Sequence, residues 1–386
     1  MRVYLDHAAS APVRPEALEA YTAALATRGN PSSIHADGRA ARAALEDARE
    51  RLAAVLDADP IEVVFTAGGT EAINLAIKGL WWAGRAAGRA AGRDAIVTTA
   101  AEHHATLDAV EWLLREGAEV CRVGVDAVAR VRLDEFEGAL AALGPRVAVA
   151  SMLWANNEVG TIEHVAGVAA VAAAHGVPLH WDAVAAFGHV PVSFRDSGAA
   201  ALSVSGHKIG APIGTGALVV RRGTEPAALV HGGGQQSGRS GTVDVAGAVA
   251  LATAAELAAR ELDAESARLR ALAERLAAGI RAVVPDAELR GDPVRRLPGH
   301  VHATFPGLLG ETLLFLLDSA GFSVSVGSAC RAGVAEPSHV LLAMGLDEPT
   351  SRSALRVTLG RDSTAGDVDA FLAALPDAVA RARAAY

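Results

Sequence analysis

A lysine is the first side chain of this sequence that stands in a setting suited to covalent chemistry. Lys208 follows an apolar run and belongs to the small, glycine-containing string SGHK (205–208). A lysine held in such a setting can form a Schiff base with a carbonyl cofactor, and the flanking Ser205 and His207 can contact an anion. The alternative is a surface lysine at a turn, so the string alone leaves both interpretations open.

A cysteine in a small-residue loop is the second candidate. Cys330 lies in the string GSACRAG (327–333), where Arg331 beside the thiol favours the reactive thiolate. The other cysteine, Cys121, alternates with apolar residues and is predicted to be buried in a strand. Two cysteines so far apart indicate neither a disulfide framework nor a zinc knuckle. Cys330 is therefore the candidate nucleophile.

An acid and a histidine follow two further apolar runs. Asp182 ends the run LHWD (179–182). A carboxylate buried there needs a cation, such as a protonated pyridine nitrogen, unless it is simply a helix N-cap. His103 lies in EHH (102–104), and adjacent histidines can stack, titrate or bind metal. No cysteine or carboxylate accompanies them at the spacing of a zinc site, so no metal is expected.

Glycine-rich turns supply candidate anion sites. In FTAGGTE (65–71) an apolar run enters two glycines before a helical pattern, so that Gly69 and Thr70 can present N–H groups to a phosphate. The string lacks GK[ST] and is therefore not a nucleotide P-loop, and an ordinary strand-to-helix turn is the alternative. The polar string WANNEVGT (154–161) and the glycine-rich strings HGGGQQ (231–236) and GRSGT (238–242) can also line an anion.

Short β-branched runs alternate with longer helical patterns up to about Val245. This alternation predicts strands joined by crossover helices in a mainly parallel α/β sheet. The expected strands are Glu62–Thr66, Ala95–Thr99, Val147–Met152, Leu179–Asp182, Leu202–Ser205 and Gly216–Val220. The expected helices are Gly38–Leu56, Thr70–Trp82, Leu107–Glu116 and Ala166–His175.

The pattern changes after Val245. The segment Ala246–Val283 predicts one or two helices that end before a proline at position 285. Further elements are expected: a helix over Glu311–Ser319, strands over Phe322–Val326 and Ser353–Leu359, and a last helix that Thr364 and Asp367 cap. We therefore predict a large domain over residues 15–260 and a smaller α+β domain made of residues 1–14 and 261–386.

The composition excludes several classes of protein. Of 386 residues, 51% are hydrophobic and 20% are charged, which is typical of a globular chain. With 44 acidic and 35 basic residues the net charge is −9, so direct binding of nucleic acid is not expected. No apolar run approaches the ~18 residues of a membrane helix. The N-terminus has no signal-peptide core, so a cytoplasmic protein without membrane contacts is expected.

Several specific strings occur in one order along nearly the whole chain. They are YLDHAA (4–9), GNPSSIH (29–35), ANNEVGT (155–161), SGHK (205–208), EPSHVL (336–341) and SALR (353–356). In this order they resemble the pyridoxal-phosphate cysteine desulfurases, which belong to the fold-type I, class-V aminotransferase group. The resemblance implies a mainly parallel seven-stranded sheet in a large domain and a smaller α+β C-terminal domain. The GSAC form of the cysteine string is similar to the branch that serves iron–sulfur assembly and tRNA thiolation.

The resemblance also implies how pyridoxal phosphate is held. Lys208 is matched to the Schiff-base lysine, Asp182 to the partner of the pyridine nitrogen, and His103 to the side chain that stacks on the ring and moves protons. The residues matched to phosphate ligands are Gly69, Thr70, Ser205, His207 and, from the neighbouring subunit of a homodimer, Thr242.

A reaction follows from the same resemblance. Asn157 and Arg356 match the positions that hold the carboxylate of L-cysteine, as the planar fork of an arginine suits that task. Lys208 removes the Cα proton, and the Cys330 thiolate attacks the substrate sulfur. Alanine and a persulfide result, and the sulfur passes to an acceptor protein, either an iron–sulfur scaffold or a tRNA-thiolation enzyme.

Three departures from the family pattern bear on this expectation. Ala185 stands where the family usually has a glutamine that contacts the phenolic oxygen of the cofactor, so the electronics of the ring should change. His7 stands where asparagine is common and is interpreted as a tolerated variant. The loop 235–239 is one residue shorter than usual, which bears on the contact of Thr242. The alternative functions are a selenocysteine lyase, a C–S lyase specialised to one pathway, and a weakly active scaffold that binds a sulfur acceptor.

Overall fold

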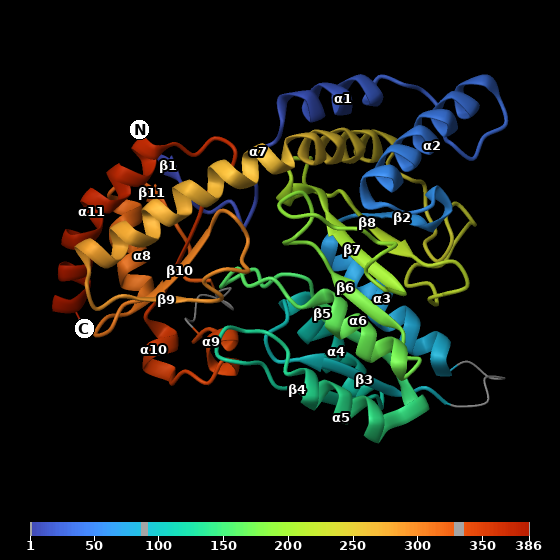
Figure 1. The fold of residues 1–386 in the computed structure, drawn as a ribbon. Coiled ribbons are helices and arrows are strands. Elements are labelled where there is room, and N and C mark those ends of the chain that lie inside the picture. The colour runs from blue at the N-terminus through green and yellow to red at the C-terminus, as the bar shows by residue number, and fades with distance from the viewer. Residues whose placement is uncertain (1, 86–91, 328–335, 386) are drawn as a thin grey trace.

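A seven-stranded sheet forms the centre of the larger part of the molecule (Figure 1). The computed structural model describes residues 2–85, 92–327 and 336–385. All strands of this sheet run parallel except β8, which is antiparallel to both of its neighbours. In sheet order the strands are β2 (Val63–Thr66), β8 (Gly216–Val220), β7 (Ala201–Ser205), β6 (Leu179–Asp182), β5 (Val147–Leu153), β3 (Ala95–Thr99) and β4 (Glu119–Val123). The predicted mainly parallel sheet is confirmed.

Helices cover both faces of this sheet, as the crossover connections of parallel strands require. On one face, α3 (Gly69–Arg85) and α4 (His104–Arg115) share a core cluster with side chains of β2, β3, β5 and β8. The other face is covered by α2 (Ala36–Leu56), α5 (Leu133–Leu143), α6 (Val165–Ala174) and the first part of α7. The helix α1 (Pro15–Leu25) lies outside α7 (Figure 1).

The helix α7 (Val245–Val283) is one continuous helix of 39 residues. Its side chains up to Ala258 belong to the core beneath the sheet, whereas those from Leu269 onward belong to a second core. It ends two residues before Pro285, which favours termination there because proline lacks the N–H that continues a helix. Of the one or two helices predicted for this segment, the structure forms one, and it connects the two cores.

The second core belongs to the C-terminal part of the chain together with its N-terminus. An antiparallel sheet in the order β12-β10-β9 lies beside a short parallel pair of β1 and β11. These strands are β9 (Glu288–Arg290), β10 (His300–Thr304), β12 (Ala354–Thr358), β1 (Val3–Tyr4) and β11 (Phe322–Ser323). The helices are α8 (Gly310–Ser319), α9 (His339–Ala343), α10 (Glu348–Arg352) and α11 (Ala365–Ala384). The predicted capping box of Thr364 and Asp367 is present at the start of α11.

Two sequence predictions need correction. The strand expected over Phe322–Val326 ends at Ser323, because the chain leaves β1 there and Ser325 instead bridges to Arg356 of β12. Cys121 does lie in a strand, but β4 is the edge of the large sheet, so the thiol is only half-buried. Partial burial raises its pKa above the ordinary value. Cys121 is therefore not an activated thiol.

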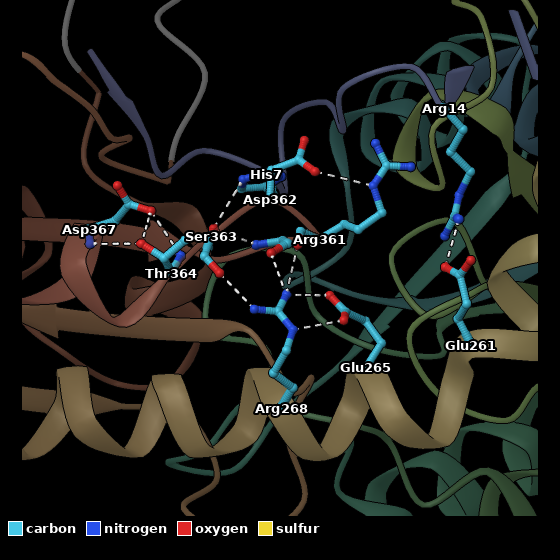
Figure 2. Close-up of polar contacts among 11 residues, drawn as sticks. His7, Arg14, Glu261, Glu265, Arg268, Arg361, Asp362, Ser363, Thr364 and Asp367 are labelled. Carbon is cyan, nitrogen blue, oxygen red and sulfur yellow. Dashed lines mark hydrogen bonds and ion pairs between the residues drawn. The ribbon is translucent and has the colours of Figure 1, made fainter. Parts of the chain in front are cut away.

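Polar contacts tie both ends of the chain to the middle of α7 (Figure 2). Arg14 Nη1 donates to Glu261 at 2.7 Å. Arg268 is paired with Glu265 and donates to the backbone carbonyls of Gly360, Arg361 and Ser363 at 2.6–3.0 Å. We call these contacts of Arg268 the α7 clasp. It fixes the segment that follows β12 and, through Ser363, it lies next to His7. In the described residues, no helix combines the length and apolar character needed to cross a membrane.

Candidate active site

Several predicted site residues lie at or directly after the carboxyl ends of the central strands. Asp182 is the last residue of β6 and Ser205 the last residue of β7. The carboxyl edge of a parallel sheet is where its loops and helix N-termini converge, so ligands bind there in open α/β folds. The structure therefore brings residues that are far apart in sequence into one site.

Lys208 ends the short 3-10 helix η3 (Gly206–Lys208) directly after β7. Its ammonium donates to the backbone carbonyls of Ala8 and Ala9, the latter at 3.2 Å. The pKa of Lys208 is lowered to about 8, chiefly by burial and also by the nearby positive charge of Arg356, while Asp6 and Asp182 oppose the shift. A lysine that loses its proton near neutral pH is a nucleophile and a base, which is the property that covalent catalysis by lysine needs.

Asp182 is 2% exposed and ends its strand inside the protein. Its carboxylate accepts a hydrogen bond from the Val184 N–H at 3.0 Å. Burial raises the pKa of Asp182 to about 6, although the Val184 hydrogen bond and the Lys208 charge act in the opposite direction. Within the described parts of the chain, no arginine, lysine or histidine forms an ion pair with this carboxylate. A cation supplied by a ligand would therefore stabilise its charged form.

His103 caps the N-terminus of α4, where its Nδ1 accepts a hydrogen bond from Ala105 N–H at 3.0 Å. Removal of the imidazole from water lowers the pKa of His103 to about 4, and the charges of Lys208 and His104 contribute. Because part of the ring is exposed, water moderates this shift. The lowered pKa favours a neutral imidazole, and the exposure of His103 leaves the side chain accessible to a ligand.

The glycine turn at the start of α3 lies against the end of β7. A Cβ atom on Gly69 would come within 2.7 Å of Val184 Cγ2 and 3.3 Å of Ser205 Cβ, so only glycine fits. Ser205 is 1% exposed, and its hydroxyl has no hydrogen-bond partner among the described residues. Thr70 lies exposed in the first turn of α3, and His207 is half-buried with a pKa lowered to about 4 by burial and by Lys208. Free N–H groups and an unpaired hydroxyl form a cradle for an anion.

Arg356 reaches this site from β12 of the C-terminal sheet. It is 5% exposed, and its two terminal nitrogens donate to the Asn157 carbonyl and to the Asp6 carboxylate, each at 2.8 Å. Its Nε has no partner among the residues that the structure describes. The sequence analysis did not single out Asp6 as a partner of Arg356. The only hint of this role in the sequence is that Asp6 is a charged residue beside an apolar one, Leu5, in the N-terminal string YLDHAA.

Of the predicted site residues, Thr242 lies apart from this group, and one further residue is outside the part of the chain that the structure describes. Thr242 is exposed and lines a cavity of about 90 Å³ together with Thr66, Gly214 and Arg239, and Lys208 is not part of its lining. Cys330 lies outside the described residues. Described residues before and after it, Gly327 and Ser338, both approach Glu158. Ser338 Oγ donates to Glu158 Oε2 at 2.6 Å, and a Cβ on Gly327 would lie 3.0 Å from the same oxygen.

Known proteins are similar to this chain over its whole length. The aminotransferase class-V family model matches residues 3–371. An IscS-like cysteine desulfurase of Mycobacterium tuberculosis is 51% identical over 385 residues, which are 99% of this chain and 97% of the relative. A solved structure named NifS-like protein superimposes with a TM-score of 0.90 at 33% identity and covers 99% of this chain and 100% of that one. A structure described as SspA in complex with cysteine has a TM-score of 0.79 at 30% identity, and the match covers 93% and 99% of the two chains.

The fold and the lysine site thus define a fold-type I, pyridoxal-phosphate-dependent class of enzyme. The chain belongs to the class-V aminotransferase family and, within it, to the cysteine desulfurases.

Proposed function

We propose that this protein removes the sulfur of L-cysteine, releases alanine and carries the sulfur as a persulfide on Cys330 before an acceptor protein takes it. One observation carries the proposal: Lys208, with its lowered pKa, lies near both the buried acid Asp182 and the buried arginine Arg356. This combination provides a nucleophilic amine, a partner for a cationic ring and a site for a carboxylate. The relatives named cysteine desulfurase, and a similar structure described as a complex with cysteine, support the same reaction.

The residues present fit pyridoxal phosphate. The unpaired, buried hydroxyl of Ser205 and the close contact at Gly69 suit the phosphate, together with Thr70 and His207. Asp182 forms no ion pair with the residues that the structure describes, and a protonated pyridine nitrogen would supply the cation. When bound, this cofactor provides an electron sink that makes the Cα–H bond of an attached amino acid acidic. We assign the covalent attachment to Lys208 and the open ring face to His103.

Each step of the reaction is assigned to a side chain of the protein. Arg356 and Asn157 hold the substrate carboxylate, and neutral Lys208 takes the Cα proton. His103 can move a proton because its imidazole is neutral. The Cys330 thiolate attacks the substrate sulfur: an S–S bond forms, the C–S bond breaks, and its electron pair stays with the substrate carbon. That carbon takes up a proton, and alanine leaves.

The proposal also covers the location, the oligomeric state and the domain boundaries of the protein. The enzyme acts as a cytoplasmic homodimer in which Thr242 reaches the phosphate of the other subunit, since Thr242 lies outside the Lys208 group within one chain. We place the domain boundaries at residues 15–260 for the large domain and 1–14 with 261–386 for the small one. The change from the sheet core to the C-terminal core along α7 supports this division.

The proposal is tested by measuring alanine released from L-cysteine in the presence of a thiol reductant, with wild-type protein and Cys330→Ala. Steady release by the wild type and little release by the variant are expected, because the thiolate is the group that takes the sulfur. Cys121→Ala is the matched control and should leave the rate unchanged. Equal release by the wild type and Cys330→Ala would remove Cys330 from the mechanism and favour a lyase.

A further inference from the structure

A small cavity lies beside Lys208, apart from the phosphate cradle. Its volume is about 20 Å³, room for about one water molecule. Lys208, Ala185 and three histidines, His7, His189 and His300, contribute to its wall. The short side chain of Ala185 leaves this space open. Apolar residues form much of the rest of the wall, so the histidines and Lys208 supply polar groups that could contact one polar atom in this space.

Among the histidines that line this cavity, His300 has a ring nitrogen that is available for a hydrogen bond. It is 8% exposed, and its Nε2 is buried without a hydrogen-bond partner among the described residues. His189 Nε2, in contrast, contacts the Lys208 carbonyl at 3.1 Å, and His7 Nε2 lies 3.4 Å from Ser363 Oγ. A buried imidazole nitrogen without a partner costs stability, so a ligand that accepts its hydrogen bond would remove that cost.

The strand register turns His300 towards the site. In the antiparallel pair of β10 and β12, His302 is opposite Arg356 and His300 is opposite Thr358. Opposite residues lie on the same face of a sheet, and residues two apart on a strand share that face. Because Arg356 contacts Asn157 and Asp6 on this face, His300 faces the site as well. The ring has little freedom, since a Cβ on Gly160 would lie 2.7 Å from His300 Cβ.

The chemistry of pyridoxal phosphate indicates which atom would enter this cavity. Its aldehyde carbon is flanked by the phosphate arm on one side and by the phenolic oxygen on the other. If the phosphate occupies the cradle at Gly69 and Ser205 and the aldehyde carbon meets Lys208, the phenolic oxygen lies on the side of Lys208 opposite the cradle. The cavity lined by Ala185 and His300 adjoins Lys208, and none of the cradle residues Gly69, Thr70, Ser205 and His207 lines it, so it offers this oxygen a place apart from the phosphate.

We propose that His300 Nε2 donates a hydrogen bond to the phenolic oxygen of pyridoxal phosphate, across the cavity that the small side chain of Ala185 leaves open. His300 is then a positioning residue that also tunes the electronics of the ring. The inference rests on the proposed cofactor and deepens it. A donor at this oxygen stabilises its ionised form and withdraws electron density from the group attached to Lys208. The bound cofactor should therefore lose its proton at a lower pH than it would without the donor.

The test is a pH titration of the absorbance of the holoenzyme, together with the dissociation constant of pyridoxal phosphate from the apoprotein. His300→Leu and His300→Gln form a matched pair, because both side chains fill a similar volume and only glutamine can donate. We expect His300→Leu to raise the absorbance midpoint by about one pH unit and to weaken cofactor binding about tenfold. His300→Gln should stay near the wild type, and Ala185→Gln should restore most of the shift when added to His300→Leu.

His302→Leu is the control on the same strand face, since His302 does not line the cavity, and it should leave the midpoint in place. An unchanged midpoint and affinity in His300→Leu would overturn the inference. If His300→Leu does not fold, the inference is tested with Ala185→Gln in the wild-type background. This substitution places a second hydrogen-bond donor in the cavity and should lower the absorbance midpoint. An unchanged midpoint would again overturn the inference. A wild-type protein that takes up no pyridoxal phosphate would instead contradict the proposed function.

Discussion

At the scale of single residues, burial rather than direct contact sets the chemistry of the site. Lys208 and Asp182 lie near each other, yet for both the largest influence on the pKa is removal from water, which favours the neutral form of each. A cofactor with a cationic nitrogen and an aldehyde would supply a partner for each of the two groups. The pKa values of these two residues therefore indicate a site that binds a ligand rather than an ion pair between Lys208 and Asp182.

The pKa of about 8 at Lys208 predicts how the apoprotein takes up its cofactor. Only the neutral amine attacks an aldehyde, and the neutral fraction rises about tenfold per pH unit below the pKa. The rate of pyridoxal-phosphate uptake by the apoprotein, measured by stopped-flow absorbance, should therefore rise from pH 6 and level off above pH 8. A rate that still climbs steeply at pH 10 would show that Lys208 keeps the ordinary pKa of a lysine.

Some residues of the site could be predicted from the sequence, and others could not. Lys208, Asp182 and His103 could be predicted because each follows an apolar run that ends in a polar string, a local signal. The contact of Asp6 with Arg356 joins residues 350 positions apart, and His300 stands in no such string. Their roles depend on how the C-terminal sheet meets the large one, which no local pattern records.

At the scale of elements, the strands were predicted well where both sheet faces are covered. Ala95–Thr99, Leu179–Asp182 and Gly216–Val220 have the predicted bounds, since buried strands appear as short runs rich in apolar residues. The strand at Phe322 was predicted too long because it changes partner after two residues, from β1 to β12. Such a change depends on tertiary packing and leaves no periodicity in the sequence.

The α7 clasp gives a prediction at the same scale. Arg268→Ala removes hydrogen bonds to the backbone carbonyls of Gly360, Arg361 and Ser363 and should lower the free energy of unfolding by about 2 kcal/mol. Urea denaturation measures the change. Arg275→Ala is the control on the same helix: its pair with Asp369 is exposed, so a loss within about 0.5 kcal/mol is expected. Equal losses in the two variants would show that the clasp adds nothing to an ordinary surface pair.

At the scale of the whole molecule, the site depends on elements from both cores. The sheet core supplies Lys208 and Asp182, whereas the C-terminal sheet supplies Arg356 and His300. We propose that a second copy of the chain completes it through Thr242. The sequence predicted a division into two parts from a change of pattern near Val245, but it left open whether one helix or two would join them.

A mixed-dimer experiment tests the contribution of the second copy. Lys208→Ala and Thr242→Asp should each inactivate the homodimer, one by removing the amine and the other by repelling the phosphate. After the two variants are unfolded together and refolded, random pairing should restore about a quarter of the wild-type activity, because half of the dimers are mixed and each has one intact site. Lack of recovery in dimers verified as mixed would place Thr242 in the site of its own chain.

The continuity of α7 also restricts how this protein can tolerate insertions and deletions. Each residue added to a helix advances the chain by about 1.5 Å and turns the rest of the helix by about 100°. One extra residue between Leu257 and Leu269 would rotate the apolar stripe of the second half away from its core, while the first half kept its place. The number of residues in this stretch therefore sets both the spacing and the angle at which β12 delivers Arg356 to Lys208.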